Sequence, residues 1–185
     1  MIEHFIGLLA QPRQVLDAGC GAGRMLPYLA DRGCDVQGFD LSEQMVARAR
    51  MDHPGFPVTV GSLTAIKHPD GTFDGVFSWY STIHNPDEDL HRMILEMVRV
   101  LAPGGHLLVA FQTGQGMRRV GKRFQAMGYD IVMNRYHRSA EWMRTRLEDQ
   151  GLTVVACLDR GPAGGEADGQ AVLIARRPAC PGRRQ

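Results

Sequence analysis

Short apolar runs that alternate with helical patterns constrain the fold of this chain more than any other feature. The runs lie at residues 15–18, 36–39, 58–60, 76–77 and 107–111, and most of them are continuous. Continuous apolar runs are typical of strands that are buried on both faces of a parallel sheet. Because parallel neighbours need crossover connections, the alternation predicts right-handed βαβ units in a doubly wound α/β sheet with helices on both faces.

Helical patterns fill the segments between these runs. Between residues 90 and 101 apolar residues recur at intervals of three and four, and Pro-Gly-Gly at residues 103–105 ends the pattern. Ser42 is the predicted N-cap of a helix over residues 43–50. Ser139 is the predicted N-cap of a later helix, which ends at Gly151.

The last part of the chain departs from this alternation. Two strand-like runs, residues 153–158 and 171–175, follow each other with a Gly-rich stretch between them, which predicts an antiparallel C-terminal hairpin. With the five earlier runs they predict a mostly parallel sheet of seven strands. We predict a single domain over residues 1–177 and a flexible tail over residues 178–185.

Residues 112–138 fit no simple period and are predicted to form a substrate-facing insertion. Within them, residues 120–127 favour a helix and residues 131–136 an extended segment. The same segment carries a basic run, composed of Arg118, Arg119, Lys122 and Arg123. On a helix such a run is more often a solvated face than a phosphate-binding surface.

Composition and charge exclude several classes of protein. The 185 residues are 44% hydrophobic with a net charge of +1, so the chain is globular and no global field favours a nucleic acid partner. Cys20, Cys34, Cys157 and Cys180 form no Cys-x-x-Cys pair, which predicts reduced thiols and no metal site. The apolar stretch over residues 5–10 is too short to span a membrane, so we predict a cytoplasmic protein without membrane contact.

A strand runs directly into a glycine-rich turn at residues 15–23, Val-Leu-Asp-Ala-Gly-Cys-Gly-Ala-Gly. Glycines let a chain turn sharply and bring its backbone close to a ligand. A dinucleotide fingerprint needs a further glycine where this chain has Arg24, and Asp17 would repel a pyrophosphate. A cationic ligand amine suits Asp17 better, which disfavours a nicotinamide dinucleotide.

Asp40 ends the next strand, about 20 residues after the glycines, where a carboxylate can accept both hydroxyls of a ribose. The alternative is that Asp40 only complements the positive end of the helix that follows Ser42. The glycine turn upstream favours ribose binding.

Together these residues resemble the class I S-adenosylmethionine-dependent methyltransferases, especially their small "type 11" branch. The resemblance extends from Gln14 to Arg177 and includes four motifs in order, at residues 17–23, 38–42, 73–78 and 98–107. It implies S-adenosylmethionine as cofactor and S-adenosylhomocysteine as product. It also implies that Asp17 and the glycine turn hold the methionine part, Asp40 the ribose, and Leu41 one face of the adenine.

The predicted cofactor-binding residues follow the ends of the first four strands: Asp17, Gly19, Cys20, Gly21, Gly23, Arg24, Asp40, Leu41, Ser62, Leu63, Ser78 and Trp79. Ser62 departs from the family, since many members have an Asp there that receives the adenine amino group, and a hydroxyl accepts more weakly. A second departure is that only residues 1–13 precede the first strand. We expect a more open site, or a homodimer partner that closes it.

Methyl transfer is an in-line displacement in which alignment supplies most of the acceleration, so a strong base is optional. Residues 78–85 are predicted to form the wall opposite the cofactor. In it, His84 is the candidate general base and Tyr80 a candidate catalytic hydroxyl. The alternatives are that His84 only fixes the loop by hydrogen bonds and that Trp79 only packs in the core.

Candidate substrate residues precede the Ser139 cap, namely Arg135, Tyr136 and His137, with Arg138 as a further partner for a carboxylate or phosphate. The alternative for them is simple surface exposure. The other five histidines, His4, His53, His68, His91 and His106, are assigned no role.

We therefore predict an S-adenosylmethionine-dependent methyltransferase that acts, without a metal, on an oxygen or nitrogen of a small molecule. A non-catalytic S-adenosylmethionine-binding partner subunit is the alternative, although the intact Asp17, Gly19, Gly21 and Asp40 argue against a degenerate site. An RNA or protein methyltransferase is disfavoured, because residues 78–81 read Ser-Trp-Tyr-Ser instead of an Asn/Asp-Pro-Pro-Tyr-like turn.

Overall fold

The structure is a computed structural model, and it describes residues 1–121, 125 and 132–179. The elements along the chain are α1 (Ile2–Leu8), β1 (Gln14–Ala18), α2 (Met25–Ala30), β2 (Asp35–Asp40), α3 (Glu43–Asp52), β3 (Val58–Val60), β4 (Phe73–Trp79), α4 (Asp87–Val100), β5 (Leu101–Thr113), β6 (Met117–Val120), β7 (Met133–Tyr136), α6 (Ala140–Glu148), β8 (Thr153–Arg160) and β9 (Gly169–Arg176).

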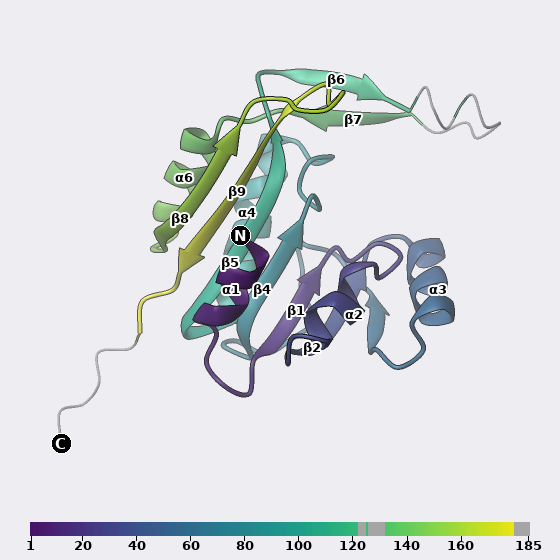
Figure 1. The fold of residues 1–185 in the computed structure, drawn as a ribbon, viewed down its shortest axis with the longest axis vertical. Coiled ribbons are helices and arrows are strands. Elements are labelled where there is room, and N and C mark those ends of the chain that lie inside the picture. Colours follow the sequence, from purple (N-terminus) through teal and green to yellow (C-terminus); the bar gives the residue numbers. More distant parts are fainter. Residues whose placement is uncertain (122–124, 126–131, 180–185) are drawn as a thin grey trace.

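The main sheet has seven strands in the order β3-β2-β1-β4-β5-β9-β8 (Figure 1). The first five strands in this order are parallel, whereas β9 runs antiparallel to both β5 and β8. This confirms the predicted doubly wound sheet and its C-terminal hairpin. The chain order reverses between β1 and β4, and ligands of such sheets bind outside the carboxyl ends of the strands at this switch point.

Helices cover both faces of the sheet, and each face has its own core. On one face, Phe5 of α1, Leu26 of α2 and Val46 of α3 pack against the sheet. On the other face, α4 and α6 bury Met97 and Leu147. Figure 1 shows α1 and α2 in front of the sheet and α4 behind it. The apolar runs therefore read as continuous because the strands are buried on both faces.

Two predicted helix starts are confirmed. The Ser42 Oγ accepts a hydrogen bond from the Met45 N–H at 3.3 Å, and the Ser139 Oγ accepts one from the Trp142 N–H at 3.0 Å. Each hydroxyl satisfies an N–H that has no partner within its helix. Helix α4 ends at Val100, and β5 begins at the next residue.

An antiparallel ribbon, β6 paired with β7, forms a second sheet of two strands. Arg118 and Arg119 lie in β6, so these two residues of the basic run are on a strand and not on a helix. The strand is largely exposed, and hence it has no alternating apolar pattern from which to predict it. Most of the predicted helix over residues 120–127 lies outside the described residues, as do Lys122 and Arg123.

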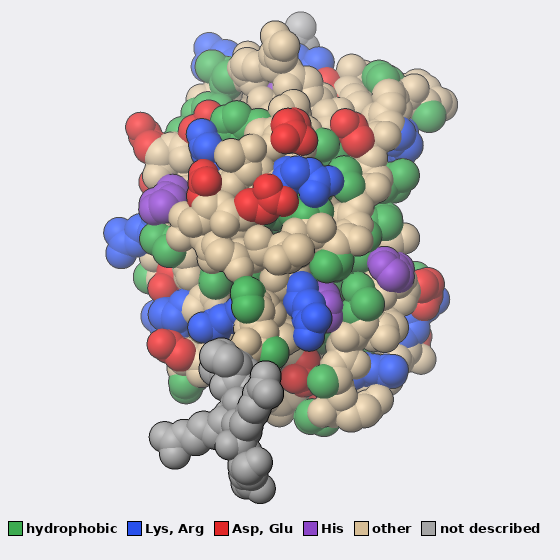
Figure 2. Space-filling view, turned by 90° about the vertical axis from the view of Figure 1, so that its left-hand side faces the viewer, with side chains coloured by type: hydrophobic (Ala, Val, Ile, Leu, Met, Phe, Trp, Pro, Cys, Tyr) green, Lys and Arg blue, Asp and Glu red, His purple; other side chains and the backbone are tan. Residues whose placement is uncertain are grey.

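The face that carries β8 has acidic and basic side chains interspersed (Figure 2). No helix in the described ranges is both long and apolar enough to pass through a bilayer. Most of the predicted flexible tail, residues 180–185, is outside the described part of the chain.

Candidate functional site

A cavity of about 820 Å³ lies at the carboxyl ends of β1, β2 and β4. It is lined by Gly19, Phe39, Asp40, Leu41, Ser42, Glu43, Gln44, Gly61, Ser62, Leu63, Tyr80, Ser81, His84, Asn85, Met93 and Met133. Parallel strands end at a common edge, and β1 and β4 flank the switch point, so residues from distant parts of the chain meet here.

The glycine turn after β1 borders this cavity. Gly19 has φ +84°, and a Cβ built on it would lie 2.4 Å from the Cβ of Ser81, so the turn packs tightly against the residues after β4. Gly21 has φ +56°, and a Cβ there would meet no atom within 4 Å. The first glycine closes the turn, and the second leaves open space beside the backbone, which suits close approach by a ligand.

Asp17 is buried at the end of β1, with 1% of its surface exposed. Burial, followed by the nearby charge of Asp40, raises its pKa to about 7. Its Oδ2 has no hydrogen-bond partner among the described residues. A buried carboxylate with an unpartnered oxygen is costly unless a cation or donor joins it. The position therefore fits the ammonium group of a ligand.

Asp40, at the end of β2, is held by the backbone on both sides. Its Oδ2 accepts a hydrogen bond from the Gly21 N–H at 2.8 Å, and its Oδ1 accepts one from the Ser42 N–H at 2.9 Å. A carboxylate oxygen can accept more than one hydrogen bond, so each oxygen can still accept from a ligand hydroxyl. Asp40 accepts from the N-cap residue of α3 and also lines the cavity, so its position is compatible with both alternatives raised by the sequence.

Three predicted adenine contacts line the same cavity. Leu41 is 72% exposed and lines the cavity, so a ligand bound there would bury its apolar surface. Leu63 is buried and lines the same cavity. The Ser62 Oγ is 2.9 Å from the Thr64 Oγ1 and accepts from the Thr64 N–H at 3.2 Å.

Tyr80 follows β4 and has φ +59°, a backbone conformation that residues other than glycine rarely adopt. Its hydroxyl donates a 2.6 Å hydrogen bond to the Gln170 Oε1. Burial raises the pKa of the hydroxyl above its usual value, so Tyr80 is a hydrogen-bond donor at neutral pH. The strained backbone directs the ring into the cavity, and such strain clusters at functional sites.

His84 lies in the loop between β4 and α4, and it is exposed at the cavity. Its Nδ1 is 2.8 Å from the carbonyl oxygen of Asn134, next to the start of β7. A carbonyl only accepts, so we assign the hydrogen to Nδ1. In the neutral ring Nε2 is then the nitrogen that can take a proton.

The remaining predicted cofactor residues are not among those that line the cavity. The Ser78 Oγ is 2.7 Å from the Ser81 Oγ. Trp79 stacks on Phe77, with ring centroids 5.5 Å apart, as the core-packing alternative expects. Arg24 is exposed at the start of α2. Asp17, Cys20, Gly21 and Gly23 belong to or flank the glycine turn.

Cys20 is not a reactive thiol. Burial, followed by the charges of Asp17 and Asp40, raises its pKa to about 12. The thiol therefore stays protonated at neutral pH and is a poor nucleophile.

Two predicted substrate residues meet at Asp168 instead of at the cavity. The Arg135 Nη1 is 3.1 Å from Asp168 Oδ2, and the His137 Nε2 is 3.2 Å from Asp168 Oδ1. Arg118 also pairs with Asp168. These contacts attach the β6–β7 ribbon to the segment before β9. Asp168 was not predicted as a functional residue, since nothing near it in the chain marks it as the partner of the ribbon.

Tyr136 and Arg138 dock the ribbon on the loop that carries His84. The Tyr136 N–H donates to the Ile83 carbonyl at 2.8 Å. Arg138 is buried, contrary to the expected surface exposure. Its guanidinium donates to the Thr82 carbonyl at 3.2 Å, to the Asn85 carbonyl at 2.5 Å and to the Asp87 carboxylate at 2.8 Å. Its hydrogen bonds therefore go to this loop.

Comparisons with known proteins agree with this geometry. Residues 15–105 match the model of a family described as "Methyltransferase domain". The malonyl-[acyl-carrier protein] O-methyltransferase of Enterobacter lignolyticus is 31% identical over 123 residues, which are 66% of this chain and 48% of that relative. This chain thus spans about half the length of that relative.

Solved structures show the same fold. An S-adenosylmethionine-dependent methyltransferase from Methanosarcina mazei superposes with a TM-score of 0.80 at 19% identity, covering 96% of this chain and 97% of that one. A 1,6-didemethyltoxoflavin-N1-methyltransferase from Burkholderia thailandensis, solved with its substrate and S-adenosylhomocysteine, superposes with a TM-score of 0.71 at 18% identity, covering 90% and 72%.

Proposed function

We propose that this chain, which matches a methyltransferase domain over residues 15–105 and has the fold of S-adenosylmethionine-dependent methyltransferases, transfers a methyl group from S-adenosylmethionine to an oxygen or nitrogen of a small molecule. The observation that carries the proposal is the pair of carboxylates at the glycine turn. Asp17 is buried with an unpartnered oxygen, and Asp40 is held at the cavity by two backbone donors.

These two carboxylates fit two polar groups of the cofactor, its ammonium group and its ribose hydroxyls. The Asp17 carboxylate would pair with the ammonium of the methionine part, and the Asp40 oxygens would accept the ribose hydroxyls. Leu41 and Leu63 would enclose the adenine, with Ser62 beside its edge. When bound, the cofactor supplies an electrophilic methyl group on a sulfonium.

We assign the steps that act on the acceptor to His84 and Tyr80, which both line the cavity. Nε2 of His84 would take the proton that an attacking hydroxyl or amine loses. The Tyr80 hydroxyl would position the acceptor, because its side chain lines the cavity and its ring is fixed through Gln170. Alignment supplies most of the acceleration, with His84 adding to it.

The charges that line the cavity favour an acceptor that is small and either uncharged or weakly charged. Its described lining includes the carboxylates of Asp40 and Glu43, Met93 and Met133, and neither Lys nor Arg. A polyanion such as RNA would meet repulsion there. The toxoflavin-precursor enzyme, which binds its small substrate on a similar fold, supports the same class. The homodimer and the cytoplasmic location predicted from the sequence stay predictions.

Calorimetric titration of the purified protein with S-adenosylmethionine, S-adenosylhomocysteine and NAD tests the cofactor. We expect micromolar binding of the first two and none of NAD. A screen with a methyl-labelled donor against phenols, amines and carboxylic acids then tests transfer. Cofactor binding without transfer to any acceptor would favour the non-catalytic subunit, and absence of cofactor binding would reject the proposal.

A further inference from the structure

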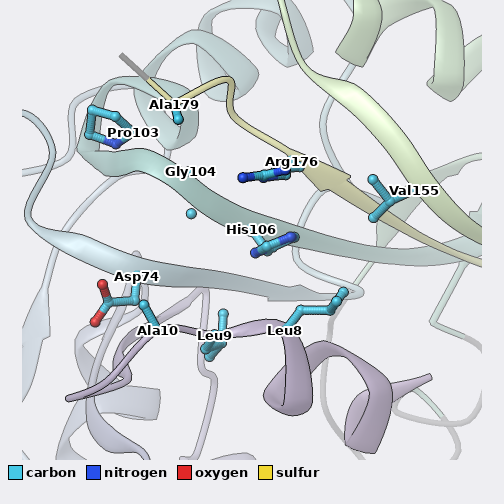
Figure 3. Close-up of a pocket in the computed structure, with 11 residues that line it drawn as sticks. Leu8, Leu9, Ala10, Asp74, Pro103, Gly104, His106, Val155, Arg176 and Ala179 are labelled. Carbon is cyan, nitrogen blue, oxygen red and sulfur yellow. The ribbon is translucent and has the colours of Figure 1, made fainter. Parts of the chain in front are cut away.

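A second cavity, of about 630 Å³, lies at the opposite end of the sheet (Figure 3). It is bounded by the end of α1, by Asp74 in β4, by the Pro103–Gly105 turn of β5, and by β8 and β9. Asp74 and Trp79 are five residues apart along β4, which at about 3.3 Å per residue separates the two ends of the strand by about 16 Å. This cavity is therefore distinct from the one at the glycine turn.

His106 supplies an unpartnered buried nitrogen to this cavity. Only 6% of its surface is exposed, and its Nδ1 has no hydrogen-bond partner in the part of the chain that the structure describes. Burial, followed by the charges of Arg176 and His4, lowers its pKa below the usual value. A buried polar atom without a partner is rare in proteins, and a ligand that pairs with it removes the cost.

Arg176 lies directly opposite His106 in the pairing of β5 with β9. It is exposed and lines the cavity, and no carboxylate in the described residues forms an ion pair with it. The acidic group in the lining, Asp74, accepts a hydrogen bond from the Gln14 N–H at 2.9 Å through its Oδ2. The guanidinium and the imidazole thus face the same cavity from adjacent strands.

The other walls of the cavity are apolar. Leu8 and Leu9 come from the end of α1, and Figure 3 shows them on the side opposite Arg176. Val155, on the edge strand β8, is 44% exposed and also lines the cavity. A ligand that fits must therefore combine one anionic group with an apolar body.

We propose that this cavity binds a small organic monocarboxylate with an aromatic or short aliphatic body. Its carboxylate pairs with the Arg176 guanidinium and accepts a hydrogen bond from His106, and its body packs between Leu8, Leu9 and Val155. Arginine suits this role because its planar fork matches a carboxylate. A volume of this size lies in the range of small-molecule sites. The proposal is independent of the methyl-transfer reaction.

Benzoate is the probe, and benzyl alcohol is the neutral control with a similar body. We expect benzoate to bind at least ten-fold more tightly than benzyl alcohol in calorimetry or NMR titration, and to shift the His106 ring resonances. Arg176→Gln should lower the affinity for benzoate at least ten-fold. Arg144→Gln, which removes an arginine that pairs with Glu141 and Glu148 on α6, should leave the affinity unchanged.

Saturation with S-adenosylhomocysteine locates the binding site. Unchanged benzoate affinity in its presence supports the cavity at His106, whereas competition would place benzoate in the other cavity and overturn the proposal. Equal affinity for benzoate and benzyl alcohol would also overturn it, and so would unaltered binding in Arg176→Gln. Arg176 is exposed near the end of β9, so this variant is expected to fold.

Discussion

The Tyr80 hydroxyl donates a 2.6 Å hydrogen bond to the Oε1 of Gln170, and this bond joins the end of β4 to the start of β9. It connects residues 90 positions apart at the rim of the candidate site. The hydrogen bond fixes the orientation of the Tyr80 ring. The backbone of Tyr80 is itself in a strained conformation.

Tyr80→Phe and Gln170→Ala should each lower the free energy of unfolding by about 1 kcal/mol, because each leaves a partly buried polar group without its partner. The double variant should lose less than the sum of the two, as measured in a urea-denaturation double-mutant cycle. Tyr28→Phe is the control, since the Tyr28 hydroxyl bonds Glu3 at an exposed site and should contribute less. Strict additivity would show that the Tyr80–Gln170 bond contributes nothing.

Asp40→Ala should weaken the binding of S-adenosylhomocysteine by at least about 100-fold, since two hydrogen bonds to a charged group contribute about 3 kcal/mol together. The variant should also lose about 1–2 kcal/mol of stability, because the Gly21 and Ser42 N–H groups lose their acceptor. Calorimetry measures the affinity at a temperature where the variant is folded. Asp35→Ala, at the exposed start of the same strand, is the matched control and should bind normally.

Asp17→Asn should stabilise the ligand-free protein at pH 8. The pKa of Asp17 in the folded protein, about 7, is raised above its ordinary value of 3.8, so the folded state binds more protons between these two values and stability is lost as pH rises from about 4 to about 7. At about 1.4 kcal/mol per unit, the gain at pH 8 is at most about 4 kcal/mol. The stabilities of the two proteins should diverge between about pH 4 and about pH 7 and differ by a constant amount above that, and a difference that does not change with pH would contradict the raised pKa.

The same substitution should weaken cofactor binding. Asn keeps the shape of Asp17 but cannot pair with an ammonium group, so we expect at least a ten-fold loss of affinity for S-adenosylmethionine at pH 8. In the wild type, affinity should fall as pH drops below about 7, where Asp17 takes up its proton. A pH-independent affinity would remove Asp17 from the site.

His84→Gln should lower turnover about 100-fold with the first acceptor identified, while the affinity for S-adenosylhomocysteine stays within two-fold, in keeping with typical general-base effects of about 10²–10⁴. His91→Gln, on the exposed surface of α4, is the control. Equal turnover in the two variants would mean that His84 only fixes the loop through Asn134.

Arg138→Met should destabilise the protein by about 3 kcal/mol, because it leaves the Thr82 and Asn85 carbonyls without their donor. Chemical denaturation measures the loss. Arg144→Met, with exposed ion pairs on α6, is the control and should change stability by less than about 1 kcal/mol. Similar losses in the two variants would contradict a special role for Arg138.

The seven-stranded sheet and the helix caps were predictable because their signals are local. An apolar run of five residues or a serine before a helix acts through its immediate neighbours, so β1, β2 and the Ser42 cap appear where the sequence places them. Strand β7 lies within the segment predicted to be extended, residues 131–136, but β6 and its pairing with β7 were missed, because β6 buries little and burial is what creates a readable pattern.

The glycine turn and Asp40 could be predicted as parts of one site, because each lies at the end of a strand and parallel strands end together. The contact partners of Tyr80 and Arg135 could not be predicted in this way. Gln170 reaches Tyr80, and Asp168 reaches Arg135, only because β9 returns antiparallel beside β5. Contacts across such separations depend on how the whole sheet packs, and no short stretch of sequence encodes them.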